Sequence, residues 1–434
     1  MLVQFIIVLT AIFIGAKKGG LGLGIFGGLG VAVLVFIFKL EPKEPPIDVM
    51  LMIAAVVTAA AALQASGGID YMVRVAERML RAYPPAITIV APIVSYFFTF
   101  LAGTGHVAYA LLPIISEVAT DAKVRPERPM SISVIASQQA ITASPISAAT
   151  AALLSVLLLA DTSIQLGTIL MIAIPATLTG VIVASIVQMF VGVDLEKDAE
   201  YQKRLKEGLL KIKHQNEKTE IKKGAPLSVL IFLTGVITIV LMGSVGSLRP
   251  VFNGVPLAMP YVIEILMLST AAFIILITKT NVVEIPRGTI FSAGMQAVIA
   301  IFGVAWMGNT FFGGNIDFFQ THLQAMVTSY PWTFSVALFV MSIMLFSQAA
   351  TVRALMPLGV SLGLPVPSLI AMFPSVNGYF VIPNYPTVLA AINFDRTGTT
   401  RIGKYVLNHS FQLPGFIATI TAVAMGFLLV GILL

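Results

Sequence analysis

Apolar windows of about twenty residues recur along the whole chain, and this pattern constrains the fold more than any other feature of the sequence. Each window is long enough to cross the ~30 Å hydrocarbon core of a bilayer as a helix. Only 11% of the residues are charged and 57% are hydrophobic, whereas a soluble domain carries about 25% charged residues. The sequence therefore predicts an all-α, polytopic membrane protein.

Composition also excludes several classes of function. The chain has no cysteine and only four scattered histidines, which argues against disulfides and against metal or redox centres. No G-x-S-x-G, H-E-x-x-H or P-loop pattern is present, so the chain is not predicted to be an enzyme. The opening MLVQFIIVLTAIFIGA has no basic residue before its apolar run and no small-residue cleavage site. It is therefore predicted to be a first span and not a signal peptide.

A charged segment at 194–225 separates two halves that resemble each other. SGGIDYM at 66–72 corresponds to GGNIDFF at 313–319, and a Tyr-Pro pair follows each motif at the same offset. Two further pairs of motifs follow in the same order, which indicates an internal repeat. The expected domains are a first repeat over 1–193, a cytoplasmic linker over 194–225 and a second repeat over 226–434.

Each half is predicted to contain three scaffold spans, a re-entrant hairpin, a broken helix and a final span. The hairpins are expected because 33 to 37 mostly apolar residues are too many for one crossing and too few for two. The broken helices are expected where proline and polar residues interrupt apolar sequence. These elements are predicted at 1–66, 84–119, 131–158 and 165–192 in the first half, and at 226–308, 332–363, 367–392 and 410–434 in the second.

The number of crossings predicts how the halves are related. An odd number of crossings per half implies that the second half is inverted, with about ten transmembrane helices plus the two hairpins, as in secondary transporters. On this topology 22 basic residues fall on one side of the membrane and only Lys39, Lys43 and Arg249 on the other. The positive-inside rule assigns the basic side to the cytoplasm and both termini to the periplasmic side. The net charge of +6 then reflects sidedness and not nucleic-acid binding.

The segment GLGLGIFGG at 20–28 contains a G-x-G-x-x-G pattern. That pattern binds dinucleotides only between a strand and a helix in water, and here it lies in a predicted span. Gly20, Gly24 and Gly28 recur every four residues. The segment is therefore predicted to be a close-packing face between helices.

Small polar residues concentrate at the predicted turns and breaks, in AGTGH at 102–106, ASPIS at 143–147 and SQAAT at 347–351. A helix that begins inside the membrane presents unpaired N–H groups and the positive end of its dipole, which suits a carboxylate. Two such regions around a pseudo-two-fold axis would match a ligand with a carboxylate at each end. The candidate substrate-binding residues are Thr104, Gly105, His106, Thr142, Ser144, Pro145, Ser147, Ser347, Gln348, Thr351, Arg353, Asn384 and Thr387.

Structural roles compete with this interpretation. Serine and threonine hydroxyls usually bond back to their own helix, and His106 could be a structural hydrogen-bonding residue. We expect Arg353 to lie near one substrate carboxylate, because a guanidinium binds carboxylates in a bidentate manner. The alternatives are that Arg353 reaches toward the outer surface or pairs with a structural acid.

The motifs LQASGG, AGTGH, ASPIS, SQAAT, NYPT and FDRTGTTRIGK resemble those of the anaerobic C4-dicarboxylate transporter (Dcu) family, most closely its A-type branch. The resemblance covers essentially the whole chain. It implies an antiporter in the inner membrane of a Gram-negative bacterium, which takes up aspartate, fumarate or malate against succinate during anaerobic growth. It also implies an elevator mechanism and a homodimer.

Other modes of transport stay open at this point. Uptake driven by Na⁺ or H⁺ is the main alternative, since carbonyls at helix breaks can coordinate Na⁺. A channel is a weaker alternative, and a sensor role could accompany transport. No cofactor is expected apart from a possible coupling Na⁺. The expected partners are small dicarboxylates, the lipid bilayer and a second copy of the chain.

Overall fold

Helices form most of the computed structural model. It describes residues 1–434 apart from 19–20, 46, 162, 209, 211–220, 316, 319–328, 346, 384 and 404–407, and apart from ten further side chains that include His106. The helices of the first half are α1 Leu2–Lys18, α2 Gly22–Ala32, α3 Ile47–Ala65, α4 Gly68–Ala82, α5 Ile87–Ala102, α6 Ala108–Asp121, α7 Glu127–Ala143, α8 Ala148–Ala160 and α9 Leu166–Gln188. A π-helical turn, η1 Val33–Ile37, continues α2.

Helix α10 Ala199–Lys206 belongs to the linker between the halves. The second half contains α11 Ala225–Ser244, α12 Met259–Thr278, α13 Thr289–Gly314, α15 Thr333–Leu345, α16 Gln348–Ser361, α17 Val366–Met372, the 3-10 segment η7 Phe373–Phe380, α18 Pro386–Phe394 and α19 Gln412–Leu433. Short 3-10 turns lie at Pro84–Ala86, Gly105–Val107, Leu195–Lys197, Gly246–Leu248 and Val282–Glu284.

The apolar helices establish a multi-pass membrane protein. Among the described residues, seven helices are long and apolar enough to cross a bilayer, or eight if α3 and α4, bent by 73° at their junction, form one span. Helices α7 and α8 count together as one of the seven. Helix α5, predicted as one arm of a hairpin, also reaches spanning length with the turn before it, whereas its counterpart α15 is shorter. The predicted number of ten and the inversion of the halves stay predictions.

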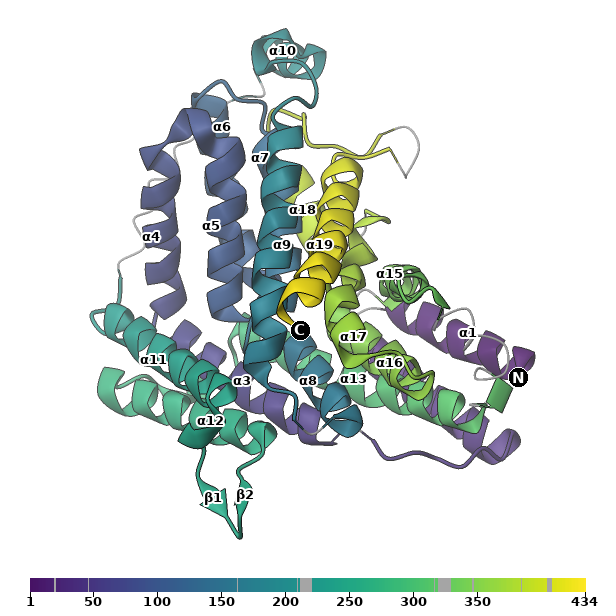
Figure 1. Cartoon of the computed structure of the whole chain (residues 1–434). Coiled ribbons are helices and arrows are strands. Elements are labelled where there is room, and N and C mark those ends of the chain that lie inside the picture. The colour runs from purple at the N-terminus through teal and green to yellow at the C-terminus, as the bar shows by residue number, and fades with distance from the viewer. Residues whose placement is uncertain are drawn as a thin grey trace.

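The only strands in the described part of the chain form a small hairpin that the sequence did not predict. Strands β1 Val251–Phe252 and β2 Val255–Pro256 pair in antiparallel register. The turn between them is Asn253–Gly254, with φ of 51° and 81°, and Asn-Gly is the preferred pair for such a turn because both residues need positive φ. The hairpin lies at the opposite end of the molecule from α10 (Figure 1).

Helices α2 and α13 are in very close contact through glycines. A Cβ atom at Gly24 would overlap the carbonyl oxygen of Ile299, and one at Gly27 would overlap the backbone of Gly303. The prediction of a packing face therefore holds for Gly24. It is wrong for Gly28, which has open space where its Cβ would lie, because the helix turns that residue away from α13. Gly20 lies outside the described residues.

Helix α3 is also fastened to α13. The side-chain oxygen of Gln64 accepts a hydrogen bond from the backbone N–H of Ile290 at 3.1 Å, and its amide nitrogen donates to the hydroxyl of Thr289 at 2.8 Å. These bonds satisfy groups at the start of α13 that have no partner within the helix. Helices α2, α3 and α13 thus form one packed unit, which we call the scaffold.

Helices α5, α7, α9 and α19 run side by side on the other side of the molecule (Figure 1). A Cβ at Gly180 of α9 would overlap the carbonyl oxygen of Ala418 on α19, so these two helices pack with their backbones nearly touching. The hydroxyls of Tyr96 on α5 and Thr177 on α9 are hydrogen-bonded at 2.8 Å. We call these four helices, together with α6, α8 and α15 to α18, the core unit.

The start of the linker is attached to the core unit by buried ion pairs. Arg125, only 4% exposed, donates to Glu127 at 2.6 Å and to Asp198 at 2.5 Å. Arg204 of α10 donates to the carbonyl oxygen of Arg396 at 3.0 Å. At the far end of the linker, Lys222 instead donates to the carbonyl oxygen of Ala65 on α3 at 2.8 Å. The linker therefore contacts the core unit at one end and the scaffold at the other.

The contact between α2 and α13 predicts a contrast between two glycines of one helix. Gly24→Ala should destabilise the protein by about 1–3 kcal/mol, because the new methyl group meets backbone that cannot move aside. Gly28→Ala should be neutral or slightly stabilising, because its methyl group meets open space. Thermal unfolding of the purified variants in detergent measures the difference, and equal melting temperatures would contradict the contact.

Attachment of the linker should weaken in acid. Burial alone would raise the pKa of Asp198, but hydrogen bonds from the Tyr201 amide and from Arg125 outweigh it and hold this pKa below its ordinary value. The carboxylate therefore stabilises the fold above the ordinary aspartate pKa, and this contribution is lost as the pH falls below that value and through the lower pKa of the folded state.

Asp198→Asn should accordingly be less stable than the wild type at pH 7 and should lose less stability over the same acid interval. The melting temperatures of the two proteins, compared across pH in detergent, test this expectation. Parallel curves would show that Asp198 does not carry the effect.

Candidate functional site

Three helix N-termini from different parts of the chain meet at one cavity of about 320 Å³. Helix α8 contributes Ala148 and Ala149, α16 contributes Gln348 and Ala349, and α18 contributes Pro386 and Thr387. The turn between α5 and α6 adds a further part of the wall, and α6, α7, α13 and η7 also contribute lining residues. None of the residues that line this cavity, within the described part of the chain, is charged. They are Gly103, Thr104, Gly105, Tyr109, Ile141, Ala148, Ala149, Gln296, Ala300, Ser347, Gln348, Ala349, Tyr379, Tyr385, Pro386 and Thr387.

The turn between α5 and α6 depends on Gly103. Its φ of 67° lies in the left-handed region, where residues other than glycine are strained. Its N–H donates to the carbonyl oxygen of Thr99 at 2.8 Å and ends α5. The chain then reverses at Thr104 and Gly105, both of which line the cavity.

The break between α7 and α8 is held by two serines. Ser144 has extended backbone, and its hydroxyl donates to the carbonyl oxygen of Phe100 on α5 at 2.7 Å. Ser147 caps α8 by accepting from the N–H of Thr150 at 3.1 Å. Pro145 lies buried between them. These residues shape the turn that delivers the start of α8 to the cavity.

Helix α16 begins in a similar way. Ser347 caps it by accepting from the N–H of Ala350 at 3.3 Å, and its side chain also lines the cavity. The hydroxyl of Thr351 bonds back to the carbonyl oxygen of Ser347 at 2.8 Å. Gln348 follows the cap directly and is buried, with 6% of its surface exposed.

The start of α18 brings Tyr385 and Thr387 to the cavity, and η7 brings Tyr379. The rings of Tyr379 and Tyr385 lie with their centroids 4.4 Å apart. The hydroxyl oxygen of Thr387 is buried and makes no hydrogen bond within the described structure. A buried hydroxyl without a partner is costly, and its place on the cavity wall marks it as a group that a ligand can satisfy.

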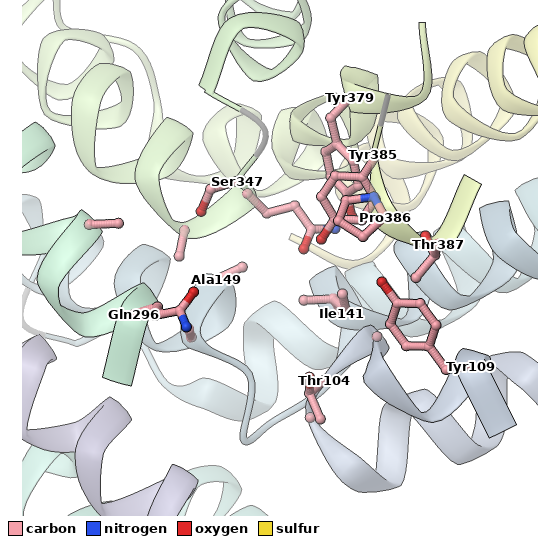
Figure 2. A pocket seen from close by; sticks show the side chains of 16 residues that line it. Thr104, Tyr109, Ile141, Ala149, Gln296, Ser347, Tyr379, Tyr385, Pro386 and Thr387 are labelled. Carbon is pink, nitrogen blue, oxygen red and sulfur yellow. The ribbon is translucent and has the colours of Figure 1, made fainter. Parts of the chain in front are cut away.

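The cavity has two distinct ends. Gln296 and Ala149 lie at one end, with Ser347 above them, whereas Tyr109 and Thr387 lie at the other (Figure 2). Helix α13 of the scaffold supplies Gln296 and Ala300, and the core unit supplies the rest. An elongated ligand would therefore touch different donors at its two ends.

A network of buried amides lies behind the cavity. Asn377, in η7, donates to the side-chain oxygen of Gln139 at 3.1 Å and to the carbonyl oxygen of Pro374 at 3.0 Å. Gln348 donates to the carbonyl oxygen of Gln138 at 2.7 Å and to the side-chain oxygen of Asn377. The network joins α7, η7 and α16, so it fixes the positions of helices that line the site.

The structure brings five of the thirteen sequence-predicted residues to this cavity, namely Thr104, Gly105, Ser347, Gln348 and Thr387. The side chain of His106 and all of Asn384 lie outside the described residues. Five others do not line the cavity. They are Thr142, which donates to the carbonyl oxygen of Gln139 at 2.8 Å, together with Ser144, Pro145, Ser147 and Thr351 in the local roles given above.

Arg353 also lies outside the cavity lining. Its guanidinium donates to the hydroxyl of Ser155 on α8 at 2.7 Å, and only 7% of the residue is exposed. The contact joins α16 of the second half to α8 of the first. In this structure Arg353 therefore positions two helices whose N-termini face the site.

Sequence reasoning missed Tyr109, Gln296, Tyr379 and Tyr385 as lining residues. Tyr385 belongs to the NYPT motif and could have been found with its neighbour Thr387. Gln296 gave no such signal, because it lies in a scaffold span away from the predicted turns and breaks.

Comparison with known proteins gives one family. A family model described as an anaerobic C4-dicarboxylate membrane transporter matches residues 1–434. The chain is 44% identical to the C4-dicarboxylate transporter DcuA of Escherichia coli (strain K12), with 99% of each chain covered. It is 43% identical to the anaerobic C4-dicarboxylate transporter DcuB of Escherichia coli O157:H7, with 98% of this chain and 97% of that chain covered. It is 41% identical to DcuA of Wolinella succinogenes, with 99% of each chain covered.

The fold is also similar to a solved structure. The YdaH transporter of Alcanivorax borkumensis matches with a TM-score of 0.55 over 93% of this chain and 88% of that one, at 13% sequence identity. At that identity the match shows a shared fold and nothing about the ligand.

The amide network predicts a large cost for removing its central member. Asn377→Leu should destabilise the protein by about 2–5 kcal/mol, because it leaves the buried oxygens of Gln139 and Pro374 without their donor. Gln296→Leu is the matched control, since that side chain makes only a long 3.4 Å hydrogen bond to Ser292. Thermal unfolding in detergent should separate the two variants, and similar losses would contradict the role of the network.

Proposed function

Because the chain belongs to the family of anaerobic C4-dicarboxylate membrane transporters, we propose that it binds a C4-dicarboxylate in the cavity between the α5–α6 turn and the starts of α8, α16 and α18. The observation that carries this proposal is the meeting of three helix N-termini at a cavity whose described lining has no charged side chain. Each N-terminus offers backbone N–H groups and the positive end of a helix dipole, which together favour a carboxylate.

The size and the ends of the cavity support a small dianion. A volume of about 320 Å³ is at the lower limit of the ~300–1,000 Å³ found for small-molecule sites. The hydroxyls of Ser347 and Thr387 lie toward opposite ends and can each donate to a carboxylate oxygen (Figure 2). A four-carbon chain with a carboxylate at each end would use both.

The proposed mechanism is an elevator, in which the core unit moves against the scaffold. Two observations support it. The glycine contacts hold α2 and α13 of the scaffold tightly together. In contrast, a second, mostly apolar cavity of about 120 Å³ lies between scaffold residues such as Val56 and Gly294 and residues of the core unit such as Ile146. A loosely packed boundary beside a tightly packed scaffold is suited to sliding. The protein is expected to act as a homodimer.

The proposed reaction is exchange across the bacterial inner membrane, with aspartate, fumarate or malate entering as succinate leaves. Both termini would lie on the periplasmic side. Helix α10 and the β1–β2 hairpin lie at opposite ends of the molecule (Figure 1), as expected if the linker and the segment after Arg249 are on opposite sides of the membrane. The main alternative is uptake driven by Na⁺ or H⁺, and a channel is the weaker one.

Transport assays with the protein reconstituted in lipid vesicles distinguish exchange, ion-driven uptake and a channel. Proteoliposomes loaded with succinate should take up labelled aspartate in the absence of any ion gradient, and empty vesicles should not. Uptake that requires an inward Na⁺ or H⁺ gradient would replace exchange with coupled uptake. Flux that does not saturate and does not depend on internal succinate would indicate a channel.

Two buried threonines should respond differently in this assay. Thr387→Val should raise the half-saturating substrate concentration about tenfold, because it removes a hydroxyl whose buried oxygen makes no hydrogen bond to the described residues. Thr351→Val should change it less than about threefold, because that hydroxyl bonds to its own helix and lies off the cavity. Equal effects of the two substitutions on the half-saturating concentration would show that Thr387 does not contact the substrate.

A further inference from the structure

Gln348 differs from the other polar residues of the cavity in that both hydrogens of its side-chain amide are already used. One points to the carbonyl oxygen of Gln138 at 2.7 Å and the other to the side-chain oxygen of Asn377. An amide nitrogen has only two hydrogens to donate. The group that Gln348 can offer to a ligand is therefore its carbonyl oxygen, which only accepts.

The orientation of this amide is set by its partners. The oxygen of Gln138 is a backbone carbonyl and can only accept, so the group facing it must be the nitrogen of Gln348. Asn377 is oriented in the same way, because its nitrogen faces the backbone carbonyl of Pro374. Its oxygen must then face Gln348. A flipped amide would bring two acceptors together at each of these contacts.

This acceptor lies beside a proposed carboxylate position. Ser347 and Gln348 stand at the start of α16, where backbone N–H groups and the helix dipole favour a carboxylate. A carboxylate bound there places the neighbouring carbon, C2, next to the start of the helix. On aspartate C2 carries an ammonium group and on malate a hydroxyl group, whereas on succinate and fumarate it carries no donor.

We propose that Gln348 determines specificity by accepting a hydrogen bond from the C2 substituent of the substrate. The inference rests on the proposed function of the cavity and adds a preference among its substrates. Aspartate and malate satisfy the carbonyl oxygen of Gln348. Succinate and fumarate leave that oxygen without a donor, and a site that loses such a bond discriminates strongly.

The wild-type protein provides the first test. Uptake of labelled aspartate into succinate-loaded proteoliposomes is inhibited with malate and with 2-methylsuccinate, which carries a methyl group where malate has its hydroxyl. Malate should inhibit at a concentration about tenfold lower, since the two compounds differ in the donor and little in shape. Equal inhibition would overturn the proposal without any mutation.

Gln348→Met provides the second test. The variant keeps the length of the side chain but loses the acceptor, so the preference for malate over 2-methylsuccinate should fall to less than about threefold. The loss of its two bonds to Gln138 and Asn377 should weaken all ligands by a common factor, which leaves this ratio unchanged. Gln139→Met is the matched control, because Gln139 belongs to the same amide network but does not line the cavity. The Gln139→Met variant should lower the affinity for all ligands by the same factor and keep the preference for malate.

The outcomes are distinct. If Gln348→Met weakens all ligands by a common factor and keeps the preference for malate over 2-methylsuccinate, its role is structural and the proposal fails. If that variant does not fold, the comparison of malate with 2-methylsuccinate in the wild type decides alone. If the wild type transports no C4-dicarboxylate, the proposed function fails, and this result is separate from a transporter that shows no preference.

Discussion

The need to satisfy backbone hydrogen bonds inside a membrane governs the arrangement of the site. A helix that starts or stops within hydrocarbon exposes N–H or C=O groups that no lipid can satisfy, so each interruption has to be enclosed by protein or by a polar cavity. Here the ends of α5, α7, η7 and α15 and the starts of α8, α16 and α18 gather in one region of the fold. Ser144 and Ser147 satisfy some of the exposed groups. The remaining N–H groups face the cavity, and they make it suitable for an anion.

Side chains behind the cavity are as important as those that line it. Gln139, Asn377 and Gln348 are almost fully buried, and they satisfy one another and nearby backbone carbonyls. A buried polar network of this kind stabilises one arrangement of helices, because any shift leaves several groups without partners at once. Arg353 extends the same principle from α16 to Ser155 on α8. The described walls of the cavity, which carry no charged side chain, thus depend also on Gln139, Asn377 and Arg353, which do not line it.

The positions of the helices could be predicted from the sequence, and the lining of the site only in part. Span lengths follow from bilayer thickness, so the predicted ranges 165–192 and 410–434 agree with α9 and α19 to within a few residues. The turns at Gly103 and Ser347 were found because small polar residues interrupt apolar sequence there. The side-chain directions were not predictable in the same way. A hydroxyl near a break can face a ligand, as Thr387 does, or bond to its own helix, as Thr351 does. Tyr379 and Gln296 reach the cavity through tertiary packing, which leaves no local pattern.

The linker has a consequence for how far the two units could separate. Arg204 attaches it to the core unit and Lys222 attaches it to the end of α3. The chain between Lys206, at the end of α10, and Lys222 contains sixteen peptide steps, and a fully extended chain spans at most about 3.3–3.6 Å per residue. This stretch of chain therefore allows a separation of at most roughly 53–58 Å between Lys206 and Lys222. This length limits how far the two units could move apart in the proposed elevator, and progressively shortened linkers would measure that limit.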